Sequence, residues 1–170
     1  YVDDIPAIAG TLVAQLVTSK VAHGRITSIR TDAARSMPGI EAIVTCADVP
    51  GTNLIGPIVH DEPLLADGMV HYVGQVIAMV VGVDYESCHR AAQLVEVEVD
   101  GLPPVLSIRE ALAVDAFHIE PHIIRRGEVD RALGAAATVL RGEVENGHQD
   151  HFYLETHASY AIPLEDDTFH

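Results

Sequence analysis

The sequence predicts a compact α/β domain, built from small β-α-β units around a mixed sheet. Over residues 24–101, segments of strand length with apolar or alternating side chains take turns with short segments of helical period. The chain of 170 residues is 48% hydrophobic, which suffices to bury a core. No internal repeat of about 20 to 50 residues is present, so we do not expect a solenoid.

A strand, a short helix and a second strand are the first predicted elements. Residues 24–30 (GRITSIR) alternate polar and branched side chains, which is typical of a strand with one buried face. Thr31 and Asp32 offer an N-cap for a helix over residues 33–37, which a Pro-Gly pair ends. Residues 40–45 (IEAIVT) then predict the second strand.

The segment from residue 51 to residue 67 has no regular period. It contains two glycines and two prolines, with His60, Asp61 and Glu62 close to one another near its middle. We expect a long ordered loop of the kind by which a rigid scaffold presents functional residues. The alternative is a surface loop with a solvated acidic tip.

A second β-α-β unit follows this loop. Residues 70–73 and 75–83 predict two strands, the latter apolar enough to be central in a sheet. Asp84 is the expected N-cap of a helix over residues 85–94, and residues 95–99 predict the next strand. This order predicts a right-handed crossover between parallel or nearly parallel strands.

The last third of the chain predicts two helices and then more strands. Ser107 caps a helix over residues 108–113, and a second helix is expected over residues 129–133. Strands are expected over residues 138–145 and through the polar and aromatic stretch 147–156 (GHQDHFYLET). The acidic turn at residues 165–167, just before the final Thr-Phe-His, should connect the two strands of a hairpin.

If residues 147–156 form a strand, its period of two gathers polar and aromatic side chains on one face. This face would carry Gln149, His151, Tyr153, Glu155 and His157. Such a row is either a solvated face, a set of buried polar residues that fix the strand, or the wall of a site, and the second interpretation is favoured. The spacing of His148 and His151 would turn the two imidazoles to opposite faces, so no metal site is predicted.

Composition excludes several classes of protein. The formal net charge of −15 argues against a nucleic-acid partner, because phosphate backbones require clustered lysine and arginine. No apolar run approaches the roughly 20 residues of a membrane-spanning helix. Cys46 and Cys88 have no metal-ligand or disulfide-framework spacing, so we expect reduced thiols in a soluble, cytoplasmic protein.

Six ordered motifs resemble the large, molybdenum-binding subunit of bacterial xanthine dehydrogenases and, more loosely, aldehyde oxidases. They are YVDDIP, PGI with TCADVPG, HDEPLLADG, VGQVIA, LPPVLSIREALA and GHQDHFYLET. The resemblance implies that residues 1–136 form the a/b hammerhead domain and that residues 137–170 begin the molybdopterin-binding domain. The chain is therefore expected to be a piece of a longer protein.

In that family, the full enzyme hydroxylates a purine or aldehyde carbon with water as the oxygen source. The resemblance implies a molybdenum-molybdopterin cofactor, with iron-sulfur centres and FAD in a partner subunit or further domains, and an oligomeric enzyme. Hypoxanthine or xanthine is the expected substrate. The resemblance places no catalytic residue, no metal ligand and no cofactor bound to this stretch alone.

The resemblance also implies two sets of site residues. Ile58, Val59 and His60 match a loop that lines the substrate channel, and a mostly apolar wall with one imidazole suits a flat heteroaromatic molecule. Vertebrate-like members carry phenylalanine where Val59 stands. Gln149 and His151, together with Glu155, would hydrogen-bond near the pterin or anchor the junction between the domains. The alternatives are an aldehyde oxidase-type enzyme and an autonomous binding or assembly module without catalysis.

Overall fold

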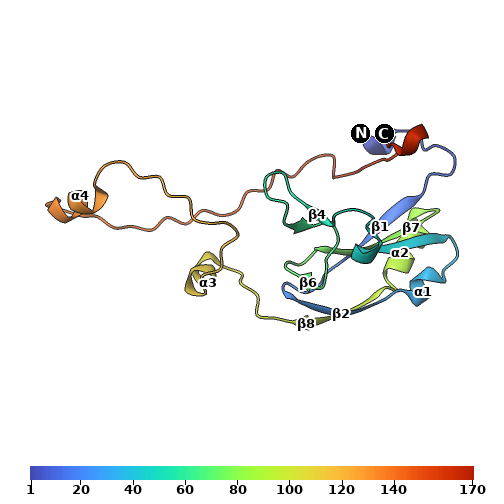
Figure 1. The fold of residues 1–170 in the computed structure, drawn as a ribbon, viewed down its shortest axis with the longest axis horizontal. Helices are drawn as coiled ribbons and strands as arrows, with labels where there is room; N and C mark the ends of the chain where they lie inside the picture. The colour runs from blue at the N-terminus through green and yellow to red at the C-terminus, as the bar shows by residue number, and fades with distance from the viewer. The chain divides into compact units, whose positions relative to one another are not determined.

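The computed structural model describes residues 1–170, apart from the side chain of Asp3, and the chain divides into two compact units. One unit is Ala7–Val114, and the other combines Tyr1–Pro6 with Asp115–His170. Figure 1 shows their helices and strands. Among the residues described, no helix has both the length and the apolar character that crossing a membrane would require.

The unit Ala7–Val114 contains two three-stranded sheets and a small hairpin, and every strand pair in it is antiparallel. The strand orders are β1-β7-β3, β6-β2-β8 and β4-β5. The bounds are β1 (Val13–Thr18), β2 (Gly24–Arg30), β3 (Ile40–Thr45), β4 (Leu54–Ile55), β5 (Glu62–Pro63), β6 (Met69–Val70), β7 (Val76–Gly82) and β8 (Glu96–Gly101).

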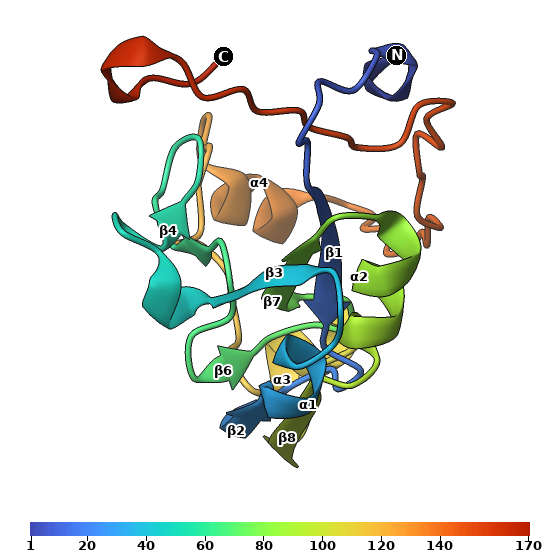
Figure 2. The same ribbon diagram turned by 90° about the vertical axis from the view of Figure 1, so that its right-hand side faces the viewer.

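Helix α2 packs on the β1-β7-β3 sheet, as Figure 2 shows. The helices of this unit are α1 (Asp32–Arg35), the 3-10 turn Cys46–Asp48, α2 (Tyr85–Ala92) and α3 (Ile108–Ala113). The predicted caps are confirmed for α2 and α3. The Asp84 carboxylate accepts hydrogen bonds from the backbone N–H of Ser87 at 2.8 Å and from its hydroxyl at 2.9 Å. The hydroxyl of Ser107 accepts from the N–H of Glu110 at 3.2 Å.

Two hydrophobic clusters form the core. The first joins the β1-β7-β3 sheet to α1 and α2, and its buried members include Ala78, Val80 and Cys88. The second lies against the β6-β2-β8 sheet and contains Val70 and Ile77. Strand β7 serves both clusters, because neighbouring side chains on a strand point to opposite faces.

The α/β class is confirmed, but the predicted mixed sheet and the predicted crossover between parallel strands are wrong, because every strand pair is antiparallel. Both edges of β7 are already paired, with β1 and with β3. Strand β8 therefore pairs with β2 in the other sheet, and α2 connects the two sheets. Strand β1 was not predicted at all.

The second unit contains little regular structure. Its elements are the 3-10 turn Val2–Asp4, α4 (Val129–Ala135) and the 3-10 turn Glu165–Asp167. The strands predicted over residues 138–145 and 147–156 are wrong, since a strand requires a partner and this unit offers none to them. The hairpin predicted at the acidic turn is confirmed. Leu164 donates to the carbonyl of Thr168 at 2.8 Å, and Pro163 forms an antiparallel bridge with Phe169.

Candidate functional site

The β4-β5 hairpin carries the three residues expected to line a substrate channel. Only two residue pairs form its ladder, and the tip between them holds Ile58, Val59 and His60. Ile58 is 90% exposed and Val59 is 56% exposed, so the tip presents apolar surface to its surroundings. The structure therefore brings these three residues together on one exposed tip rather than in the core.

The root of the hairpin is fastened to the core by Asn53. Its side-chain amide donates to the carbonyl of Leu65 at 2.8 Å, and its side-chain oxygen accepts from the Leu65 N–H at 3.1 Å. Its backbone carbonyl accepts from the N–H of Leu64 at 2.7 Å. Leu65 and the following Ala66 are buried, so the tip stands on a fixed base. Sequence analysis did not single out Asn53.

The second set of predicted residues, in the unit with Asp115–His170, lies on irregular backbone. Phe152 adopts a positive φ of 47°, and its N–H donates to the carboxylate of Asp150 at 3.0 Å, which interrupts an extended strand. Glu155 accepts from the backbone N–H of Val2 at 2.8 Å. Glu155 is thus engaged in holding the start of the chain.

Part of the predicted face nevertheless forms in this unit. The rings of His151 and Tyr153 stack with their centroids 5.4 Å apart, and the ring centroids of Tyr153 and His157 are 5.9 Å apart. Gln149 and His151, with Asp150, line an open cavity of about 360 Å³. All of these side chains are exposed, so the interpretation as buried residues that fix a strand is wrong for this structure.

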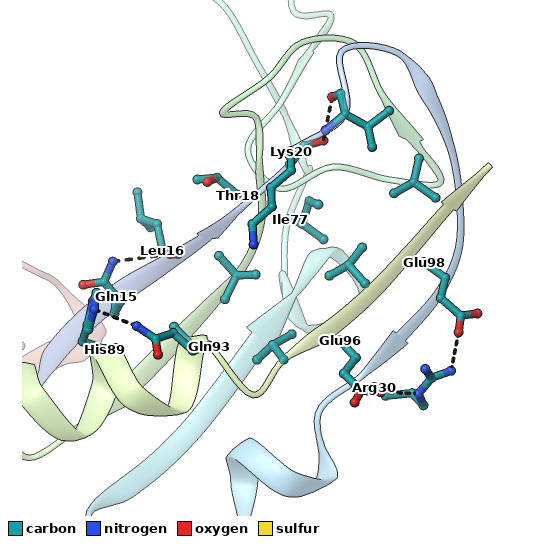
Figure 3. A pocket seen from close by; sticks show the side chains of 17 residues that line it. Gln15, Leu16, Thr18, Lys20, Arg30, Ile77, His89, Gln93, Glu96 and Glu98 are labelled. Atoms are coloured by element: carbon teal, nitrogen blue, oxygen red, sulfur yellow. Dashed lines mark hydrogen bonds and ion pairs between the residues drawn. The ribbon is translucent and has the colours of Figure 1, made fainter. Parts of the chain in front are cut away.

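A larger groove of about 740 Å³ in Ala7–Val114 was not predicted (Figure 3). Strands β1 and β8 flank it, and each of these strands is paired along one edge only. Ile77 contributes to its apolar lining, and the side-chain amide nitrogen of Gln93 donates a 2.9 Å hydrogen bond to Nε2 of His89 at one end. The groove could not be predicted from the sequence, because strand β1, which forms one of its walls, was not predicted either.

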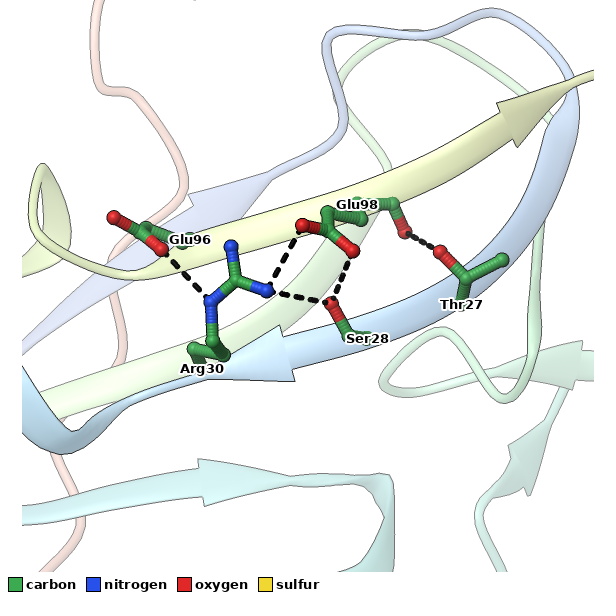
Figure 4. A network of polar contacts seen from close by, with 5 residues as sticks. All are labelled: Thr27, Ser28, Arg30, Glu96 and Glu98. Atoms are coloured by element: carbon green, nitrogen blue, oxygen red, sulfur yellow. Dashed lines mark hydrogen bonds and ion pairs between the residues drawn. The ribbon is translucent and has the colours of Figure 1, made fainter.

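Two carboxylates that line this groove, those of Glu96 and Glu98, are already paired with neighbouring side chains (Figure 4). The Arg30 guanidinium contacts Glu96 at 2.9 Å and Glu98 at 2.8 Å. The hydroxyl of Ser28 donates to Glu98 at 2.9 Å. These hydrogen bonds lower the pKa of Glu98, and the one from Arg30 has the largest effect. The network fastens β2 to β8.

Among the described residues, no group of three or more His, Cys, Asp or Glu is placed to hold a metal ion.

The hairpin-bearing unit and the segment after it match two protein-family models. Residues 1–103 match the model described as aldehyde oxidase and xanthine dehydrogenase, a/b hammerhead domain. Residues 115–170 match the molybdopterin cofactor-binding domain. The chain belongs to the aldehyde oxidase and xanthine dehydrogenase family, and the resemblance noted from its motifs is confirmed.

Curated xanthine dehydrogenases are similar to this chain over nearly all of its length. The chain is 44% identical over 162 residues to xanthine dehydrogenase 1 of Arabidopsis thaliana, covering 94% of this chain and 12% of that enzyme. It is 38% identical over 167 residues to xanthine dehydrogenase/oxidase of Gallus gallus, covering 98% of this chain and 12% of the relative. The chain thus spans about an eighth of the length of these relatives.

Solved structures agree with the family assignment. The aldehyde oxidoreductase from Desulfovibrio gigas superimposes with a TM-score of 0.65 at 31% identity, over 78% of this chain and 16% of that one. Quinoline 2-oxidoreductase from Pseudomonas putida 86 gives a TM-score of 0.65 at 29% identity, over 84% of this chain and 20% of its own. These two enzymes share the fold, and their names indicate different substrates, an aldehyde and quinoline.

Proposed function

We propose that this chain is part of the large subunit of a molybdenum hydroxylase that oxidises purines such as hypoxanthine and xanthine with water as the oxygen source. The observation that carries the proposal is the match to xanthine dehydrogenases over 94% of the chain, together with the two family models in consecutive order. Ala7–Val114 acts as scaffold and channel wall, and the chemistry belongs to the cofactor.

The β4-β5 hairpin forms part of the channel wall in this proposal. Ile58 and Val59 supply an apolar surface that a flat ring can cover without leaving polar groups unpaired, and His60 supplies one imidazole. Their exposure at the tip supports the assignment, because a channel wall must offer its side chains to the substrate. Val59 makes the wall less bulky than the phenylalanine of vertebrate-like members.

The molybdopterin cofactor, which supplies the redox and oxygen-transfer chemistry when bound, finds fitting partners in Gln149 and His151. An amide and an imidazole beside an open cavity are groups that hydrogen-bond a pterin ring. Glu155 is better assigned to anchoring, since its carboxylate already accepts from Val2. Iron-sulfur and FAD partners, an oligomeric assembly and a cytoplasmic location belong to the same proposal. The domain boundary expected after residue 136 stays a prediction.

The test uses the full-length protein. Molybdenum and pterin content are measured on the purified enzyme, and turnover of xanthine and of benzaldehyde is measured on the same sample. The proposal expects molybdenum, pterin and xanthine turnover. Full-length protein without molybdenum would overturn it in favour of a binding or assembly module. Turnover of benzaldehyde but not xanthine would replace the purine substrate with an aldehyde.

A further inference from the structure

The conformation of the hairpin tip depends on Gly56. This residue has a φ of +144°, a value that residues with a side chain rarely adopt. A Cβ atom at this position would overlap the carbonyl oxygen of Val59, which is backbone and cannot rotate away alone. Any side chain at Gly56 must therefore displace Val59, one of the two apolar residues that the tip presents.

The orientation of the whole hairpin depends on Asn53. A ladder of two residue pairs is too short to hold a hairpin by itself. Asn53 adds three hydrogen bonds to Leu64 and Leu65, two of them through its side chain. Because Leu65 is buried, these bonds transfer the rigidity of the core to the tip.

We propose that Asn53 and Gly56 are positioning residues that set the substrate selectivity of the enzyme through Ile58 and Val59. The proposal rests on the proposed function, in which these two apolar residues line the substrate channel. Gly56 fixes the shape of the tip, and Asn53 fixes its direction relative to the core. Neither residue touches the substrate in this scheme.

The expected effect follows from the size of the substrate. An apolar contact of about one methylene changes discrimination by about 10- to 200-fold. A two-ring purine covers more of an apolar wall than a single-ring aldehyde does. Displacing the wall should therefore weaken the binding of xanthine more than that of benzaldehyde, and the effect should appear in KM while kcat is largely kept.

The experiment compares variants of the full-length enzyme. Gly56→Ala and Asn53→Ala are assayed with xanthine and benzaldehyde. Gly51→Ala is the matched control, because this glycine lies in the same loop without a positive φ and a Cβ there meets open space. We expect the ratio of kcat/KM for xanthine to that for benzaldehyde to change about tenfold in both variants and less than about twofold in the control.

Two further measurements separate positioning from loss of structure. Molybdenum content and thermal midpoint should stay near wild type in Gly56→Ala and Asn53→Ala. Equal losses of kcat for both substrates, with less molybdenum bound, would show a structural role and overturn the proposal. An unchanged selectivity ratio in both variants would overturn it as well.

Direct variants of the wall distinguish this proposal from the proposed function. Val59→Phe and Ile58→Ala change the wall itself without altering its support. If they leave the selectivity ratio unchanged, the channel assignment fails, and the positioning proposal fails with it. If they change the ratio and the variants of Asn53 and Gly56 do not, only the positioning proposal is wrong.

Discussion

Truncation of Val80 to alanine should destabilise the chain markedly. Val80 lies in the middle of β7 with 0% exposure, in the cluster between the sheet and helix α2. The change removes both methyl groups, which at about 0.8 kcal/mol per buried carbon is about 1.6 kcal/mol. The cavity left behind adds about 1 kcal/mol, because a sheet core held from both edges of β7 collapses only partly. The free energy of unfolding should fall by about 2.5 kcal/mol.

Equilibrium urea unfolding followed by circular dichroism measures this loss, and a thermal midpoint lower by about 5 to 10 °C should accompany it. Val83→Ala provides the control, because Val83 follows β7 directly and is 51% exposed. Its free energy of unfolding should change by less than about 0.5 kcal/mol. A Val80→Ala variant as stable as Val83→Ala would refute the assignment of this core.

Two further predictions concern pH and thiol reactivity. Because the fold lowers the pKa of Glu98 below its ordinary value of 4.5, mainly through Arg30, the stabilisation is present above that value and is lost as the pH falls through the lowered pKa. Between about pH 6 and about pH 3, the thermal midpoint of Glu98→Gln should therefore drop less than that of the wild type. An equal drop in the two proteins would contradict this. Burial raises the pKa of the thiols of Cys46 and Cys88, and Cys88 is fully buried. Mass spectrometry should find iodoacetamide on half-buried Cys46 first and on Cys88 only after unfolding; equal labelling of the native chain would count against the fold.

Local sequence signals predicted the elements whose stability is local. The helix α2 was expected from Asp84 followed by apolar residues at helical spacing, and both Asp84 and buried Cys88 perform the expected tasks. The central position of β7 followed from its nearly continuous apolar run. In each case the physical cause lies within a few residues of the element.

Pairing between distant strands could not be predicted in this way. Strand β1 escaped notice because its outward positions include Leu16, so its alternation of apolar and polar side chains is weak. The partner of β8 could not be predicted without knowing that β7 is paired along both edges, with β1 and with β3. The groove beside β1 was missed for the same reason.

The candidate site shows the same division. The motif placed Ile58 and Val59 together on a loop, and the structure presents them on one tip. The support from Asn53 involves hydrogen bonds across 12 residues, and an asparagine in a loop resembles an ordinary turn residue. The strand expected through Gln149 and His151 had the right alternation, but alternation alone does not supply a partner.

The sharing of β7 between two hydrophobic clusters has a mechanical consequence. Ile77 belongs to one cluster, its neighbour Ala78 belongs to the other, and Val97 packs against both. The hairpin root joins the same strand, because the N–H of Ala66 donates to the carbonyl of Val76 at 2.8 Å. A force applied to the hairpin is therefore transmitted first to β7, so we expect the two clusters to lose their packing together rather than one after the other.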